Sequence, residues 1–80
     1  MKTINVTYFA ILREERGLKN ESLETSVVNG KELYEELSSK YNFSLNAEIL
    51  RIAINGSFES LDTPLNERDE IAFIPPVAGG

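Results

Sequence analysis

One segment with helical periodicity, flanked by segments that alternate like strands, constrains the fold of this 80-residue chain most. Three of its apolar residues recur at intervals of four and so share one stripe of a helix: Leu33, Leu37 and Tyr41. Asn29 is a favourable N-cap residue. The carboxylate of Glu32, three residues later, can accept a hydrogen bond from the Asn29 N–H. We therefore predict a helix over Gly30–Tyr41.

Strand patterns precede this helix. Residues 3–12 alternate between two faces, which predicts a half-buried strand with Ile4, Val6, Tyr8 and Ala10 on one face and Asn5, Thr7 and Phe9 on the other. A charged break over residues 13–19, which contains Gly17, separates it from a second predicted strand over residues 21–28. The two strands would form an N-terminal hairpin.

A second hairpin is predicted after the helix. Residues 50–54 form a short apolar run typical of a buried strand, and residues 57–61 are the predicted return strand. Between them, Asn55 and Gly56 form the strongest two-residue hairpin signal, and Gly56 supplies the positive φ that such a turn requires. We expect this hairpin to join the same sheet.

The last strand is predicted over Glu70–Ile74. A loop with Pro64 and a turn over residues 66–69 lead into it. Pro75 and Pro76 have no backbone N–H, so pairing along that edge should end there.

The order of elements predicts an α+β fold in a single domain spanning residues 1–80, with a mixed sheet of about five strands on one main helix. One helix covers one sheet face, so the other face must be polar or bind a partner. Phe9 lies on the predicted polar side of the first strand, and Ile74 is out of phase with Ile71 and Phe73. With Phe58, after the turn, these residues would form an apolar interface patch.

The composition excludes most catalytic chemistry. The chain has no cysteine and no histidine, so thiolate ligands, cysteine nucleophiles and the commonest general base are missing. No phosphate-binding glycine loop is present, and carboxylates adjacent in sequence, such as Asp69 and Glu70, point apart. We expect no metal, no cofactor and no enzymatic activity from this chain alone.

The charge and hydropathy patterns constrain its partners and location. A net charge of −5 repels phosphate backbones, which argues against nucleic acid and favours a basic protein partner. The longest apolar run, residues 8–12, is far shorter than the roughly 20 residues of a membrane span. No signal-peptide pattern opens the chain, so the expected location is the cytoplasm, without a membrane partner.

The α-carboxylate at the end of the chain is a candidate reactive group. Residues 75–80 read Pro-Pro-Val-Ala-Gly-Gly, which predicts an extended, flexible tail with two stiffening prolines at its base. Gly79 and Gly80 carry no Cβ, so a narrow channel in another protein could admit them and the α-carboxylate of Gly80. An incidental flexible end is the alternative.

Three stretches resemble the MoaD family of ubiquitin-like β-grasp proteins, the small sulfur-carrying subunits of molybdopterin synthase. They are residues 8–14 (Tyr-Phe-Ala-Ile-Leu-Arg-Glu) with Gly17 shortly after, residues 53–55 (Ala-Ile-Asn) and residues 69–80, which end on the two glycines. The resemblance spans essentially all 80 residues, although residues 19–50 match in pattern alone.

The resemblance implies a carrier mechanism. An ATP-dependent enzyme would adenylate Gly80, and a sulfur donor, such as a persulfide-bearing protein, would convert it to a thiocarboxylate. The thiocarboxylate would enter the active site of the large subunit and donate sulfur to cyclic pyranopterin monophosphate, in a heterotetramer of two small and two large subunits. Gly79, which has no side chain, would let the tail pass through a narrow channel to that active site. The expected contacts to the large subunit comprise the patch and the base of the tail: Phe9, Phe58, Ile74, Pro75, Pro76, Val77 and Ala78.

Two other functions remain open at this point. The first is a β-grasp sulfur carrier for thiamine synthesis, tRNA thiolation or protein conjugation, since the activation chemistry is shared. The second is a non-reactive β-grasp interaction module with an incidental tail. The prolines and valine at 75–77 and the Phe-Ala-x-Leu-Arg-Glu pattern of the first strand favour the molybdopterin function.

Overall fold

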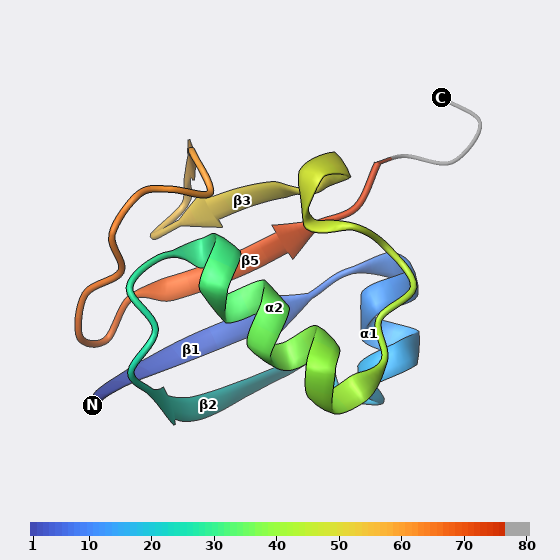
Figure 1. Ribbon diagram of the computed structural model, residues 1–80, viewed down its shortest axis with the longest axis horizontal. Helices are drawn as coiled ribbons and strands as arrows, with labels where there is room; N and C mark the ends of the chain where they lie inside the picture. Colours follow the sequence, from blue (N-terminus) through green and yellow to red (C-terminus); the bar gives the residue numbers. More distant parts are fainter. Residues whose placement is uncertain (77–80) are drawn as a thin grey trace.

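The computed structural model describes residues 1–76 of the chain (Figure 1). Its elements are β1 (Lys2–Tyr8), α1 (Ala10–Arg16), β2 (Asn20–Thr25), α2 (Gly30–Tyr41), the 3-10 helix η1 (Ala47–Ile49), β3 (Arg51–Ile54), β4 (Ser57–Glu59) and β5 (Glu70–Ile74). The strands form one five-stranded sheet in the order β2-β1-β5-β3-β4. The central pair, β1 and β5, is parallel, and the other pairs are antiparallel. The predicted mixed sheet on one main helix, the ubiquitin-like β-grasp arrangement, is confirmed.

Helix α2 has the predicted bounds. The Asn29 side chain accepts a hydrogen bond from the Glu32 N–H at 2.9 Å, which fixes the first turn. The Glu32 carboxylate, however, accepts from the N–H of Val28 at 2.9 Å and not from that of Asn29, so the expected reciprocal contact is displaced by one residue. Leu33 and Leu37 of the predicted stripe are buried against the sheet.

The segment between β1 and β2 differs from the prediction. The expected strand over residues 3–12 ends at Tyr8, and most of the expected charged break is helix α1, which ends at Arg16 and is capped by Gly17 with φ +81°. The second strand is also shorter than predicted and ends at Thr25. β1 and β2 do pair antiparallel as expected, although α1 stands between them in the sequence.

The second hairpin turns at the predicted residues. Asn55 and Gly56 have φ of +53° and +86°, the two positive values that a type I′ turn requires. The return strand, β4, ends at Glu59 and not at residue 61. Asp69, before β5, is buried, and its carboxylate accepts from the Asn55 side-chain amide at 2.9 Å. The side-chain oxygen of Asn55 accepts from the Glu70 N–H at 2.9 Å, so this corner fixes the start of β5.

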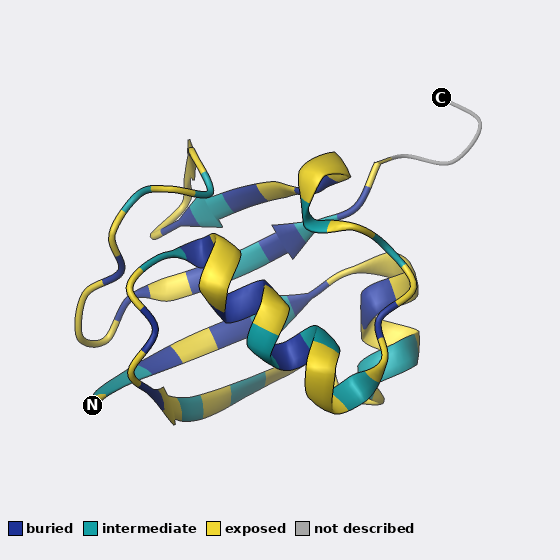
Figure 2. Cartoon of the chain, viewed as in Figure 1, coloured by how far each residue is buried: buried dark blue, intermediate teal, exposed yellow. Residues whose placement is uncertain are grey.

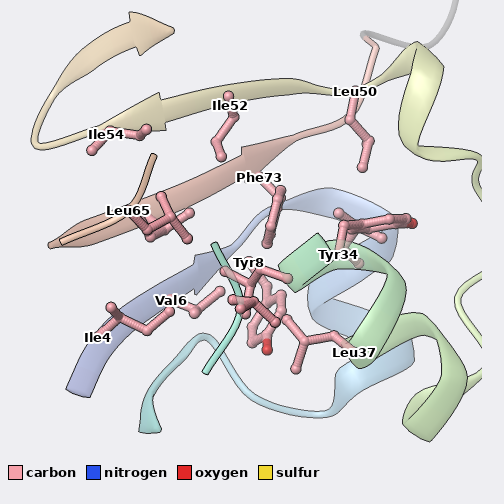
Figure 3. Packing of buried hydrophobic residues seen from close by; sticks show 14 of the residues in the cluster. Ile4, Val6, Tyr8, Tyr34, Leu37, Leu50, Ile52, Ile54, Leu65 and Phe73 are labelled. Carbon is pink, nitrogen blue, oxygen red and sulfur yellow. The ribbon is translucent and has the colours of Figure 1, made fainter. Parts of the chain in front are cut away.

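The core lies between α2 and one face of the sheet. Figure 2 shows buried residues along the side of α2 that faces the strands and exposed residues on its outer side. Aromatic rings fill one end of this layer. The ring centroid of Tyr34 on α2 lies 5.3 Å from that of Phe73 (Figure 3). It lies 5.5 Å from the ring centroid of Phe43. The rings of Tyr8 and Phe43 meet edge-on, with their centroids 6.0 Å apart. This cluster lies under the end of the sheet where β1 and β5 both finish.

Candidate functional site

The chain turns sharply at the end of β1. Phe9 has an extended backbone and serves as the N-cap residue of α1, and Ala10 follows with φ +53°. A residue with a Cβ rarely adopts this left-handed conformation. The turn takes Phe9 out of the strand, so the expected grouping with Asn5 and Thr7 along a strand is wrong. The Phe9 side chain is nevertheless 44% exposed.

An apolar groove of about 750 Å³ opens beside this turn. It is lined by residues 9–11 at the start of α1, by Leu45 in the loop after α2, and by residues 74–76 at the end of β5. These segments meet because β1 and β5 are parallel, which brings their carboxyl ends to the same edge of the sheet (Figure 1). Every lining side chain is apolar, so the groove offers a binding surface without an ionisable group.

Phe58 lies elsewhere, on the sheet face that α2 leaves open. It pairs with Ala53, and Ala53 pairs with Ala72 of β5, so all three share that face. Ile74 follows two residues after Ala72 and therefore lies on it too. Phe58 is 66% exposed, and its ring centroid is 6.0 Å from the guanidinium carbon of Arg51. The structure thus brings Phe9 and Ile74 together at the groove, whereas Phe58 lies outside the groove, exposed on the open face beside Arg51.

The predicted site residues of the tail fall into two groups. Pro75 is buried and Pro76 is exposed, and both line the groove. Val77, Ala78, Gly79 and Gly80 lie outside the described residues. Their roles as partner contacts and as the reactive end remain predictions.

Sequence reasoning missed three groove residues, Ala10, Ile11 and Leu45. The alternating pattern places Ile11 in a strand that in fact ends three residues earlier, although the charged run that follows it, residues 13–16, is compatible with an exposed helix. Leu45 carries no signal in the sequence, because a single apolar residue in a loop is common. Only the fold brings it opposite residues 74–76.

An ion pair holds α1 against the sheet. The guanidinium of Arg16 donates two hydrogen bonds of 2.8 Å to the two oxygens of the Glu21 carboxylate on β2. The Tyr8 hydroxyl donates to the same carboxylate at 2.6 Å, and the Arg16 guanidinium lies 3.9 Å from the centroid of the Tyr41 ring. The hydrogen bonds from Arg16 lower the pKa of Glu21 below its ordinary value of 4.5. One contact set therefore ties together β1, α1, β2 and α2.

Among residues 1–76, no three His, Cys, Asp or Glu side chains are grouped so that they could hold a metal ion. In the same residues, no helix has the length and apolar character to cross a membrane. The arrangement can bind an apolar surface next to the base of the tail.

Comparisons with known proteins agree with this arrangement. The model of the ThiS family matches residues 6–80. A curated relative from Haemophilus influenzae, named molybdopterin synthase sulfur carrier subunit, is 35% identical over 80 residues and is aligned with 96% of this chain and 99% of its own. A relative of the same name from Mycobacterium tuberculosis is 36% identical over 84 residues, with 100% of both chains covered.

Solved structures give a similar result. The small archaeal modifier protein 1 from Methanosarcina acetivorans is 29% identical and has a TM-score of 0.77, with 100% of this chain and 98% of that chain covered. A chain in the complex of subunits 1 and 2 of the molybdopterin-converting factor from Helicobacter pylori is also 29% identical, with a TM-score of 0.66 and coverage of 98% and 99%.

Proposed function

This chain belongs to the ThiS family, and we propose that it is the sulfur carrier subunit of a molybdopterin synthase. The observation that carries the proposal is the match to proteins of that name over their full length. The groove at the base of the tail supports it, because a carrier must bind the enzyme that receives its end.

The reacting group in this proposal is the α-carboxylate of Gly80. A carboxylate is a poor electrophile, so a partner enzyme uses ATP to form an acyl adenylate and releases pyrophosphate. A persulfide sulfur attacks the acyl carbon and AMP leaves. A thiol then attacks the donor's sulfur in the resulting acyl disulfide, which leaves a thiocarboxylate on Gly80 and a mixed disulfide between the donor cysteine and the thiol.

Sulfur transfer follows on the large subunit. The thiocarboxylate sulfur attacks an electrophilic carbon of cyclic pyranopterin monophosphate and displaces an oxygen substituent, so that a C–O bond breaks as the C–S bond forms and a thioester joins Gly80 to the pterin. Water hydrolyses this thioester, so the sulfur stays on the pterin and Gly80 returns to a carboxylate. Because Gly79 has no side chain, the tail next to the acyl carbon is thin enough to enter a narrow channel. The chain is not an enzyme alone, and the groups that bind the phosphorylated pterin belong to the large subunit.

The proposed partner surface comprises the groove, Phe58 and the base of the tail. Phe9 and Ile74 lie at the groove, and Phe58 lies on the open sheet face beside it. The similarity to a chain of the Helicobacter pylori complex, which joins subunits 1 and 2 of the molybdopterin-converting factor, supports a large-subunit partner. An assembly of two small and two large subunits in the cytoplasm completes the proposal.

A protein modifier is the second candidate. The similarity to the small archaeal modifier protein 1 favours it, because the two chains agree over their whole length. A modifier would be activated at the same carboxylate, but the acceptor would be a lysine amine and the product an isopeptide. The two functions therefore differ in what attacks the acyl carbon.

Intact mass spectrometry with fragment analysis tests the proposal. The chain is incubated with the cognate adenylating enzyme, ATP and a persulfide donor with thiol, and a variant lacking Gly80 is the matched control. We expect a mass gain equal to the replacement of one oxygen by sulfur, located at Gly80 and missing from the control. Formation of molybdopterin on addition of the large subunit and the pterin substrate would then separate this function from the modifier, which would instead become linked to lysine residues. No mass change with an active adenylating enzyme would refute the sulfur carrier, and no lysine-linked product in addition would refute the modifier.

A further inference from the structure

The turn between β3 and β4 contains an asparagine whose side chain can react with the backbone of the next residue. Asn55 is followed by Gly56, and both residues are exposed. Glycine has no side chain to shield its backbone nitrogen, so this nitrogen can reach the side-chain Cγ of Asn55 when the turn opens. Apart from its chain neighbours, no described residue lies within 4 Å of a Cβ placed at Gly56, so the turn is open to water. Asparagine belongs to the thermolabile residue types.

The reaction needs no reagent besides water. The Gly56 nitrogen attacks Cγ of Asn55, the Cγ–Nδ2 bond breaks, and ammonia leaves with the proton of the Gly56 N–H, which gives a cyclic imide. Water then adds to one of the two imide carbonyl carbons and breaks its bond to nitrogen, which regains a proton. Opening at Cγ yields aspartate. Opening at the backbone carbonyl carbon yields isoaspartate, in which the main chain is one carbon longer.

In the closed corner the amide of Asn55 is held at both of its polar atoms. Its nitrogen donates to the Asp69 carboxylate and its oxygen accepts from the Glu70 N–H, each at 2.9 Å. Cyclisation requires both bonds to break. The turn can open locally, because β4 lies at the edge of the sheet and consists of three exposed residues. Opening so small a unit costs much less free energy than global unfolding.

Asn29 and Gly30 form a second pair of the same type, in a setting that resists opening. The Asn29 side chain accepts from the Glu32 N–H at the start of α2. Gly30 is buried, and a Cβ placed there would overlap the side chain of Ile52 in the core. Exposing Asn29 to cyclisation therefore requires the first turn of α2 to leave the core.

We propose that Asn55 is a spontaneous deamidation site of the folded chain, reached by local opening of the β3–β4 hairpin, and that the product releases the start of β5. Either product carries a carboxylate at position 55, in place of the amide that donates to Asp69. Asp69 is 7% exposed, and its other carboxylate oxygen accepts from the Asn66 N–H at 2.7 Å. This bond holds Asp69 beside position 55, so the two like charges repel. The inference does not depend on the proposed function.

Peptide mapping by mass spectrometry tests which asparagine reacts first. The full chain is incubated in native buffer and in concentrated urea until the urea sample has converted, and each site is scored for the replacement of NH₂ by OH. We expect Asn55 to convert at least about tenfold faster than Asn29 in native buffer, because local opening free energies range from near zero to the global value. In urea the two sites should convert at similar rates, since they share the Asn-Gly sequence. Equal rates in native buffer, faster conversion of Asn29, or no conversion of Asn55 would overturn the inference.

Urea unfolding of Asn55→Asp, which reproduces one product, tests the consequence. The double variant Asn55→Asp with Asp69→Asn is the matched control, because it restores one amide and one carboxylate at the corner. We expect the unfolding equilibrium constant to rise at least about tenfold for Asn55→Asp, as for a buried polar group that loses its partner, and most of this rise to disappear in the double variant. Wild-type stability of Asn55→Asp, or no recovery in the double variant, would contradict the proposed repulsion. If Asn55→Asp does not fold, a folded double variant supports the inference and an unfolded one contradicts it.

Discussion

Replacing Glu21 by Gln should destabilise the fold in a pH-dependent way. The Glu21 carboxylate accepts two hydrogen bonds from Arg16 and one from Tyr8, and the Arg16 and Glu21 side chains are only 18% and 16% exposed. Gln retains an acceptor oxygen but loses the charge. Hydrogen bonds to charged groups contribute about 1.5–3 kcal/mol and neutral ones about 1, so we expect a loss of about 1–2 kcal/mol at neutral pH. For a chain of this size, each 1 kcal/mol corresponds to about 4–8 °C in the melting temperature.

The sign of the pH dependence follows from the pKa of Glu21. Arg16 lowers this pKa in the folded chain below the ordinary 4.5, so the folded state favours the ionised carboxylate. The stabilisation is therefore fully present above pH 4.5 and is lost as the pH falls through the lower folded pKa. Urea unfolding of the wild type and Glu21→Gln should show a difference in free energy at pH 7 that shrinks below pH 4.5. Glu24→Gln, on an exposed residue of the same strand, is the control and should change the free energy by less than about 0.5 kcal/mol at either pH. A Glu21→Gln difference as small as the control's, or one that does not change with pH, would refute the reasoning.

Two further substitutions test the packing of α2 and the open sheet face. An added Cβ at Gly30 would overlap the Cδ1 of Ile52, which is buried, so Gly30→Ala should lower the free energy of unfolding by about 1–3 kcal/mol in urea titrations; an unchanged value would show that Ile52 adjusts freely. Phe58 is mostly exposed, so Phe58→Ala should leave the melting temperature nearly unchanged and raise the Kd for the large subunit about tenfold in calorimetry. A lower melting temperature with unchanged affinity would instead make Phe58 a structural residue.

Local signals account for the elements that the sequence predicts correctly. Helix α2 begins and ends at the predicted residues because the N-cap of Asn29 and the apolar stripe are both encoded within the segment. β5 is bounded in the same way, since Pro75 directly follows its last residue. The turn at Asn55 and Gly56 needs two positive φ values, and few other residue pairs accept them.

Helix α1 could not be predicted from the same kind of signal. The alternation of β1 continues by chance into Ala10, which predicts one more strand residue on the buried face. In the structure Ala10 has a positive φ and is exposed, and Leu12 becomes the buried residue of the new helix. The contacts that stabilise α1 are tertiary: Leu12 in the core, and Arg16 paired with Glu21 across the loop to β2. A periodicity read along the chain does not contain them.

The residues of the candidate site likewise divide into those that a local sequence signal predicts and those that only the tertiary structure brings together. Ile74 is predictable because it is out of phase with its neighbours in β5, a property of the strand alone. The prediction for Phe9 relies on a strand that ends before it, so its exposure agrees with the prediction for a different reason, the turn at Ala10. Ile11 and Leu45 line the groove only because the fold brings together residues 9–11, the loop after α2 and residues 74–76. None of these three segments alone carries a sequence signal for the groove. A groove without an ionisable side chain can position a partner but cannot activate a carboxylate. In the proposed function, the fold therefore acts by holding an apolar surface within reach of Gly80, and the charged and catalytic groups have to come from the proteins that dock there.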